Sequence, residues 1–239
     1  MSDLLKQAVA AHGGLERWNA FSRLTARARI GGVLWTLKRQ KTLLADINVG
    51  IETHTERLAI APFGGVDRRS VFRPDLLKIE TTDGRLIDER SDPESAFAGH
   101  TQETPWDPLH VAYFASEALW TYLTLAFLYT YPGFVSEEIA PWQEDGETWR
   151  RLKVTFPDTI KSHTRTQVTL FGADGLMRRH DYTVDVLGGA QGANYTSGYR
   201  SFQGLNVPTR RRVYAHDAAM RKVPGPLLVS IDFDDITFS

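Results

Sequence analysis

The sequence predicts a mainly β (α+β) fold, a curled antiparallel half-barrel of about 10–11 strands with an N-terminal helix and a central buried helix. Segments in which apolar and polar residues alternate recur along most of the chain, joined by short turns such as Asp83-Gly84. One central segment is apolar on all sides. No Pro/Gly/Ser-rich linker interrupts the chain, so we expect a single domain over residues 1–239.

Residues 1–20 predict an N-terminal helical segment. Ser2 is a typical N-cap residue, and apolar residues follow it at helical spacing until Gly13-Gly14 ends the pattern. A secretory signal has a basic start and an apolar run of about 7–15 residues, and this segment shows neither. We therefore expect an amphipathic helix and a cytoplasmic protein.

Alternating segments predict strands on both sides of the central helix. Before it, we expect strands at residues 24–38, 43–51, 71–73, 76–81 and 85–89. After it, we expect strands at residues 134–140, 148–156, 166–171, 176–187, 195–203, 209–215 and 227–238. Gly31-Gly32 is expected to form a bulge or bend within the first strand. An antiparallel sheet of this size must curl, and its concave side can hold a helix and a ligand.

Residues 91–149 are acidic. They contain ten carboxylates and no Lys or Arg, whereas the rest of the chain is basic. Within them, Asp107 to Thr130 predicts a helix in which Asp107 is the N-cap and Pro108 takes the first position. We expect this acidic helical insertion to pack on the basic sheet. An acidic docking surface for a basic partner is the alternative.

The central helix includes a run from Ala118 to Ser136 that has no charged residue. A membrane-spanning helix needs about 20 apolar residues, with basic residues on its cytoplasmic side. Pro132-Gly133 interrupts this run, and acidic residues flank it. We therefore predict a helix buried in the protein and no transmembrane segment.

Composition excludes several kinds of site. A formal net charge of −1 provides no overall attraction to nucleic acid. Without Cys, the chain has no thiolate nucleophile, disulfide or zinc–cysteine site. No phosphate-binding glycine loop, HExxH motif or GxSxG motif occurs, and the seven His residues are scattered. We therefore expect no metal and no cofactor.

His180 and Tyr182 are candidate catalytic residues. Alternation places Arg178, His180, Tyr182 and Val184 on one face of a strand. If this face lines the concave side of the sheet, His180 offers a general base and Tyr182 a phenol donor. The alternatives are that both make ordinary cross-strand hydrogen bonds, or that the register of the strand is flipped.

Aromatic residues accompany His110 on the central helix. His110 and Tyr113 are three residues apart, Trp106 precedes the helix, and Trp120 follows two to three turns later. His110 is a further catalytic candidate, while Trp106, Tyr113 and Trp120 could form a flat-walled pocket for an aromatic ligand. The alternative is that this stripe belongs to the packed core.

Arginines in the strands are candidates for binding a ligand that carries a carboxylate. We select Arg150, Arg178 and Arg211, because Arg150 shares a predicted face with Leu152, and Arg211 with Val213. An arginine that points inward needs an anionic partner. A carboxylate of the acidic segment is the alternative partner.

The order of elements resembles that of the LolA/LppX-like superfamily of lipoprotein-carrier half-barrels. The segments that carry the resemblance are HGGLERW (12–18), DGL (174–176) followed by RHDY (179–182), GLNVPT (204–209) and IDFDDITF (231–238). The resemblance implies an eleven-stranded half-barrel covered by helices, with a hydrophobic cavity for acyl chains or other apolar ligands. An enzyme of violacein biosynthesis has a similar fold and acts on an aromatic intermediate without a cofactor.

Three functions follow as hypotheses. The first is a soluble half-barrel that binds a hydrophobic or aromatic small molecule, including one with a carboxylate, between sheet and helix. The second is a cofactor-independent isomerase, cyclase or lyase that acts on an aromatic or polyketide-like metabolite in the same cavity. The third is an interaction protein that uses the acidic segment as its surface.

Overall fold

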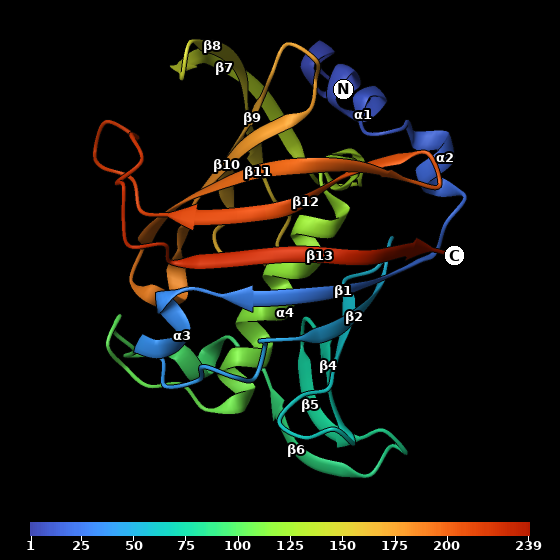
Figure 1. Ribbon diagram of the computed structural model, residues 1–239, viewed down its shortest axis with the longest axis vertical. Coiled ribbons are helices and arrows are strands. Elements are labelled where there is room, and N and C mark those ends of the chain that lie inside the picture. Colours follow the sequence, from blue (N-terminus) through green and yellow to red (C-terminus); the bar gives the residue numbers. More distant parts are fainter.

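Thirteen strands form one antiparallel sheet in the computed structural model, which describes residues 1–239 (Figure 1). The strands are β1 (Arg23–Gly31), β2 (Ile47–Glu52), β3 (Arg57–Ala61), β4 (Arg68–Arg73), β5 (Leu76–Thr81), β6 (Leu86–Ser91), β7 (Val135–Glu144), β8 (Glu147–Thr155), β9 (Thr166–Phe171), β10 (Met177–Val184), β11 (Ala190–Phe202), β12 (Leu205–Tyr214) and β13 (Val229–Phe238). Across the sheet their order is β6-β5-β4-β3-β2-β1-β13-β12-β11-β10-β9-β8-β7. The sheet is therefore two meanders that meet where β1 pairs with β13, and β6 and β7 remain its separate edges.

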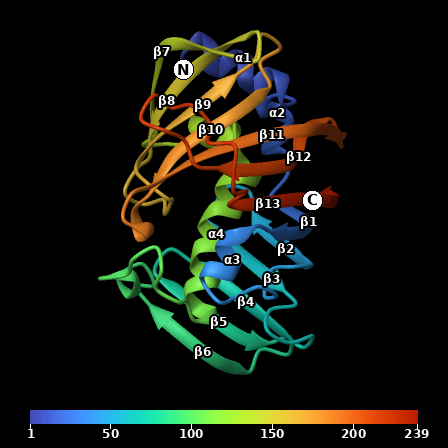
Figure 2. The ribbon, with the colours of Figure 1, turned by 60° about the vertical axis from the view of Figure 1, so that its left-hand side comes forward.

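Few helices accompany this sheet. They are α1 (Asp3–Ala11), α2 (Leu15–Asn19), α3 (Val33–Leu37) and α4 (Pro108–Thr124), with 3-10 turns η1 (Ser95–Phe97), η2 (Phe127–Thr130) and η3 (Asp185–Leu187). Figure 2 shows α4 running along the inner side of the curled sheet. None of the helices is long and apolar enough to span a membrane.

The predicted half-barrel with a helix inside it is confirmed, although the sheet has 13 strands rather than about 10–11. The alternating pattern did not indicate β3, which directs only Leu58 and Ile60 into the core. The predicted strand over residues 43–51 begins only at Ile47. Short strands carry too few alternating positions to be distinguished from loops.

Residues 33–38 are not part of the first strand, contrary to the prediction. β1 ends at Gly31, and Gly32 has a φ of 111°, a backbone conformation that side-chain-bearing residues rarely adopt. A Cβ atom at Gly32 would lie 2.3 Å from the carbonyl oxygen of Leu228. The chain therefore turns here into α3, whose Trp35 is buried and donates from Nε1 to the Gly31 carbonyl.

Helix α4 begins where the sequence predicts. The Asp107 side chain accepts from the His110 backbone N–H, and the Asp107 backbone N–H donates to His110 Nδ1, which completes a capping box. The helix ends at Thr124, six residues before the predicted end, and the Thr124 hydroxyl donates to the Trp120 and Thr121 carbonyls. Every residue from Leu109 to Thr124 is buried, which explains the absence of a polar face.

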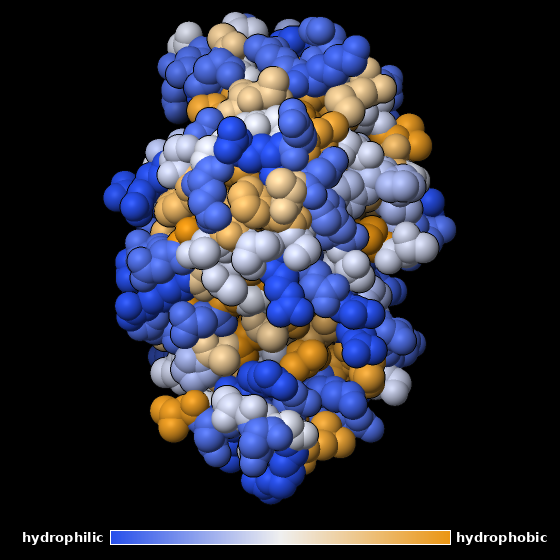
Figure 3. Space-filling model, turned by 90° about the vertical axis from the view of Figure 1, so that its right-hand side faces the viewer, coloured by the Kyte–Doolittle hydropathy of each residue, from blue (hydrophilic) through white to orange (hydrophobic).

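The first half of the sheet packs directly against α4. In β1, burial alternates strictly, so that Leu24, Ala26, Ala28 and Ile30 point inward. Strands β3, β4 and β5 contact α4, and the hydrophobic core joins the helix to this half of the sheet. Figure 3 shows the face on which β13 ends, where hydrophobic side chains form small groups among hydrophilic ones.

The acidic segment 91–149 is only partly helical, because it ends in β7 and the start of β8. Seven of its carboxylates pair with basic side chains from the rest of the chain: Glu94–Lys161, Asp107–Arg90, Glu117–His163, Glu137–Lys153, Glu138–Arg150, Glu144–Arg179 and Glu147–Arg178. These pairs join the segment to the sheet and neutralise part of its negative charge.

Candidate functional site

A cleft lies between α4 and the centre of the sheet. Its cavity volume is about 130 Å³, and 17 of its 21 lining residues are hydrophobic. These are Ile30, Leu34, Trp35, Leu37, Phe114, Ala115, Ala118, Leu119, Tyr122, Tyr182, Val184, Leu187, Ala190, Val213, Leu228, Val229 and Ile231. The lining therefore comes from α3, α4, η3 and the strands in the second half of the sheet, together with the end of β1.

Three lining side chains can exchange a proton: Tyr122, His163 and Tyr182. The hydroxyl oxygens of Tyr122 and Tyr182 are 2.5 Å apart and share a hydrogen bond. The ring of His163 lies next to that of Tyr182, with 4.9 Å between the centroids. Burial raises the pKa of Tyr122 to about 12 and raises the pKa of Tyr182 well above its ordinary value. Both residues are therefore neutral phenols at neutral pH.

His163 is held by a buried carboxylate of α4. Its Nδ1 lies 2.8 Å from Glu117 Oε1, and both side chains are at most 5% exposed. The His163 ring also stacks on Phe114, with 4.6 Å between centroids and 30° between planes. The hydrogen bond and the stacking together fix the orientation of the imidazole in the wall of the cleft.

A second buried carboxyl group, Glu56, lies close to this pair. Its Oε2 accepts from the Lys161 backbone N–H at 2.8 Å. Burial, with a smaller contribution from the charge of Glu117, raises the pKa of Glu56 well above its ordinary value. Glu56 therefore favours its protonated form more than an ordinary carboxyl group does.

Beyond the tyrosine pair lies a group of buried polar residues: His180, Asn194 and Arg211. In the pairing of β10 with β11, His180 lies opposite Asn194. Tyr182, two residues further along β10, lies opposite Gly192. Both ring nitrogens of His180, both amide atoms of Asn194, and Nε and Nη1 of Arg211 lack hydrogen-bond partners. Buried polar atoms are costly when unpaired, so this group is a polar region behind the tyrosine pair that favours hydrogen-bonding partners.

Within this group, His180 is uncharged and Arg211 has no ionic partner. Burial, and then the positive charge of Arg211, lower the pKa of His180 well below its ordinary value, so its imidazole is neutral. Arg211 is 1% exposed, and no carboxylate pairs with it. Its Nη2 donates to the Tyr122 carbonyl at 2.7 Å, and its guanidinium lies over the Tyr122 ring at 4.5 Å from the centroid. This end of the cleft therefore carries a buried positive charge without an ionic partner.

Among the nine residues predicted for the site, only Tyr182 lines the cleft, and His180 and Arg211 lie behind it. His110 is instead the N3 residue of the capping box of α4, with Nε2 3.2 Å from the Ala96 carbonyl. The structure thus separates His110 from His180 and Tyr182, with which it was predicted to act.

The predicted aromatic stripe belongs to the core. Trp106 packs on Phe114, with ring centroids 4.9 Å apart, and Tyr113 packs on Phe72 at 5.9 Å. Trp120 is fully buried and donates from Nε1 to the Glu52 carbonyl at 2.8 Å. None of the three predicted aromatic residues lines the cleft. They pack around α4 without reaching the cleft.

Arg150 and Arg178 lie away from the cleft and have carboxylate partners. Arg150 Nε is 2.7 Å from Glu138, and Arg178 Nη2 is 2.8 Å from Asp174. A register shift between Met177 and Arg179 breaks the alternation of β10, so Arg178 does not share the face of Tyr182 as predicted. The bulge could not be read from the alternating pattern.

Sequence reasoning missed Glu117, Tyr122 and His163. His163 lies in the loop between β8 and β9 and carries no periodic signal. Glu117 is the single charged residue within α4, between Leu109 and Thr124, and it is buried there. A lone carboxylate in an otherwise apolar helix was the one sequence signal that could have indicated a buried partner.

Gly192 lies opposite Tyr182 in the pairing of β10 with β11, and its lack of a side chain leaves room for the Tyr182 ring. A Cβ atom at Gly192 would lie 2.8 Å from Cε2 of Tyr182, which is too close for a ring held by Tyr122. Gly192→Ala is therefore expected to displace Tyr182 and to lower the free energy of unfolding by about 1–3 kcal/mol, measured by urea denaturation. Gly50→Ala is the control in β2, because a Cβ there meets nothing within 4 Å. Equal stability of the two variants would contradict this account of Gly192.

The structure contains no group of three His, Asp or Glu residues placed to hold a metal ion.

Comparison with known proteins identifies the fold. No protein-family model and no curated protein matches the sequence. A DUF1329 family protein from Desulfovibrio piger is similar in structure with a TM-score of 0.53 and 12% identity, over 98% of this chain and 91% of that one. A LolA superfamily protein from Nitrosomonas europaea is similar with a TM-score of 0.52 and 8% identity, over 99% and 92%. The predicted LolA-like fold is thereby confirmed.

Proposed function

We propose that the protein binds an apolar or aromatic small molecule in the cleft between α4 and the sheet. The observation that carries the proposal is a wall with 17 hydrophobic residues among 21, beside an otherwise tightly packed core. Exposed apolar surface of this extent is unfavourable in water, and a ligand that covers it gains about 25 cal/mol per Å². The LolA-like fold, which offers a concave apolar surface, supports the same function. The cytoplasmic location stays a prediction.

We further propose that the ligand carries an acidic group. Arg211 has two unpaired nitrogens and no carboxylate partner, and its guanidinium stacks on Tyr122, which lines the cleft. A carboxylate at the inner end of the cleft would lie beside the Tyr122 ring, over which the guanidinium sits, and would balance its buried charge. The aromatic or acyl part of the ligand would then fill the apolar remainder.

A matched pair of probes tests this function. 2-Naphthoate and the neutral 2-naphthamide have nearly the same shape, and we expect calorimetry to show both binding, with naphthoate about 10-fold to 100-fold tighter. Arg211→Met is expected to remove this preference while it retains naphthamide binding. Arg150→Met is the control, because Arg150 lies outside the cleft. Equal affinities in the wild type, or a preference that survives in Arg211→Met, would reject the assignment of the acidic group to Arg211.

An acid–base enzyme is the second candidate function. The observation that favours it is the presence of His163, Tyr122 and Tyr182 together in an otherwise apolar wall. Titratable groups concentrated in one cleft are typical of catalytic sites. This function uses the same cleft and the same class of ligand.

A further inference from the structure

The polar groups of the cleft limit the chemistry that it can perform. Apart from Gln102 and Gln191, the only lining side chains with polar hydrogens are Trp35, His163, Tyr122 and Tyr182. No Ser, Thr, Lys, Asp or Glu side chain lines the cleft, so it presents no aliphatic hydroxyl, amine or carboxylate nucleophile. Proton transfer by the imidazole and the phenols is the chemistry that these groups support.

His163 has the arrangement of a general base. Its Nδ1 lies 2.8 Å from Glu117 Oε1, and an Nδ1–H that donates to this carboxylate leaves Nε2 as the proton acceptor. Nε2 makes no hydrogen bond within the protein, although His163 lines the cleft. The Glu117 side chain, 2.8 Å away and buried with the imidazole, is placed to stabilise the imidazolium that forms when Nε2 accepts a proton.

The tyrosine pair has the arrangement of an oxyanion donor. Two hydroxyl groups that share one hydrogen bond leave one O–H free to donate to a further acceptor. The rings of Tyr182 and Tyr122 lie 4.9 and 6.4 Å from the ring of His163, measured between centroids. A small molecule in the cleft can therefore contact the base and the donor simultaneously, as enolisation of a carbonyl compound requires.

We propose that the cleft catalyses proton transfer in an apolar or aromatic ketone, with His163 as the base and Glu117 as its positioning residue. His163 Nε2 removes a proton from the carbon next to the carbonyl, and the C–H electron pair forms the enolate, whose oxygen accepts from the free tyrosine O–H. The imidazolium then returns the proton, either to the same carbon or to a conjugated one, which isomerises the molecule. No atom or electron is gained or lost. This inference rests on the proposed binding of an apolar molecule in the same cleft.

2-Tetralone is a suitable probe, because it is apolar and aromatic and has acidic C–H bonds next to its carbonyl. We expect the wild type to accelerate exchange of these hydrogens in D₂O, observed by proton NMR. His163→Gln is expected to reduce the rate above the buffer background roughly 10²-fold to 10⁴-fold. Tyr182→Phe is expected to reduce it less, since Tyr122 retains a hydroxyl. His54→Gln is the control, because His54 is exposed and lies outside the cleft.

A positioning role for Glu117 predicts a separate signature. In ¹⁵N NMR spectra of the wild type, we expect His163 to carry its proton on Nδ1 and the Nε2 resonance to move when 2-tetralone binds. Glu117→Gln is expected to lower the exchange rate and to shift its pH profile, whereas a purely structural role would leave the profile unchanged in folded protein. If His163→Gln fails to fold, the tautomer of His163 and the movement of its Nε2 resonance in the wild type still test the proposed role.

Calorimetry separates this inference from the proposed function. If 2-tetralone binds but exchanges at the buffer rate, or if His163→Gln exchanges as fast as the wild type, the catalytic assignment is wrong and binding stands. If 2-naphthoate binds and 2-tetralone does not, the ketone assignment is wrong and binding again stands. If neither molecule binds, both the inference and the proposed function fail.

Discussion

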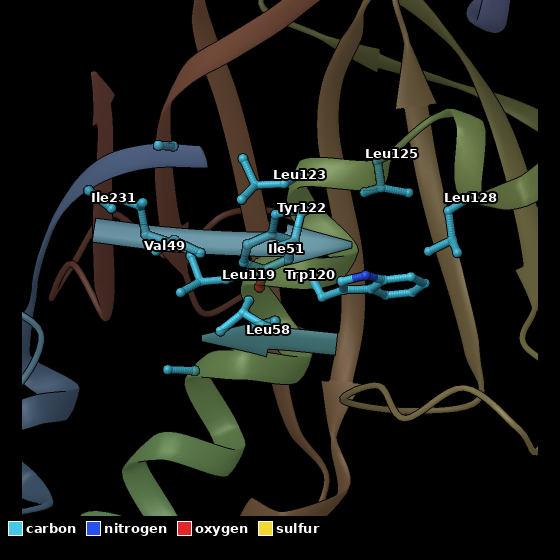
Figure 4. Packing of buried hydrophobic residues seen from close by; sticks show 14 of the residues in the cluster. Val49, Ile51, Leu58, Leu119, Trp120, Tyr122, Leu123, Leu125, Leu128 and Ile231 are labelled. Atoms are coloured by element: carbon cyan, nitrogen blue, oxygen red, sulfur yellow. The ribbon is translucent and has the colours of Figure 1, made fainter. Parts of the chain in front are cut away.

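Trp120→Ala is expected to lower the free energy of unfolding by about 3–5 kcal/mol, the largest change in stability that we predict. Trp120 is fully buried, and Figure 4 shows its ring among hydrophobic side chains of α4 and the segment that follows it. Truncation would leave a large cavity and remove the hydrogen bond to the Glu52 carbonyl. Urea denaturation measures the change directly.

Trp120→Phe distinguishes a core residue from a ligand-binding one. Phe keeps most of the buried ring and loses the hydrogen bond, so we expect a smaller loss of about 1–3 kcal/mol. Because Trp120 does not line the cleft, folded Trp120→Phe should bind 2-naphthoate as the wild type does. If Trp120→Phe is as stable as the wild type but no longer binds 2-naphthoate, Trp120 belongs to the ligand-binding site, as the sequence predicted.

Ala118→Trp is expected to weaken the binding of 2-naphthoate by roughly 100-fold or more. Ala118 lies on α4, is 8% exposed and lines the cleft, so an indole at this position would occupy the space of the ligand. We expect little loss of stability, because the new ring fills open volume rather than a packed core. Calorimetry and urea denaturation of the same sample measure the two effects.

Two matched substitutions control for the introduced indole. Ala112 is also on α4 but is completely buried outside the cleft, so Ala112→Trp should destabilise the protein by overpacking. Ala98 is exposed and remote from the lining, so Ala98→Trp should bind like the wild type. Undiminished binding by Ala118→Trp would place the ligand elsewhere.

Much of the fold could be predicted from the sequence, because it depends on local patterns. Alternation along β1 and the all-round apolar character of α4 result directly from what each element packs against. The Asp107-Pro108 pair likewise determines where α4 begins. The short helix α3 was missed, because its cause is the close approach of Leu228 to Gly32 from a distant part of the chain.

The site was much less predictable, because its geometry is set by contacts between distant residues. His163 meets Glu117 across 46 residues of chain, and neither the loop nor the helix indicates its partner. The β-bulge at Arg178 changed which side chains of β10 share a face. Arg211 is buried, as its predicted face with Val213 implied, but its lack of a carboxylate partner became visible only when the whole sheet was assembled.

The most direct test of the central claim is methyl NMR of the wild type during titration with 2-naphthoate. We expect saturable chemical-shift changes at Ala118, Leu119, Val184 and Val213, whose side chains line the cleft, and intermolecular nuclear Overhauser effects from the same methyl groups. If instead the shifts are absent, or are confined to methyl groups outside the cleft such as that of Leu58, the cleft between α4 and the sheet is not the binding site.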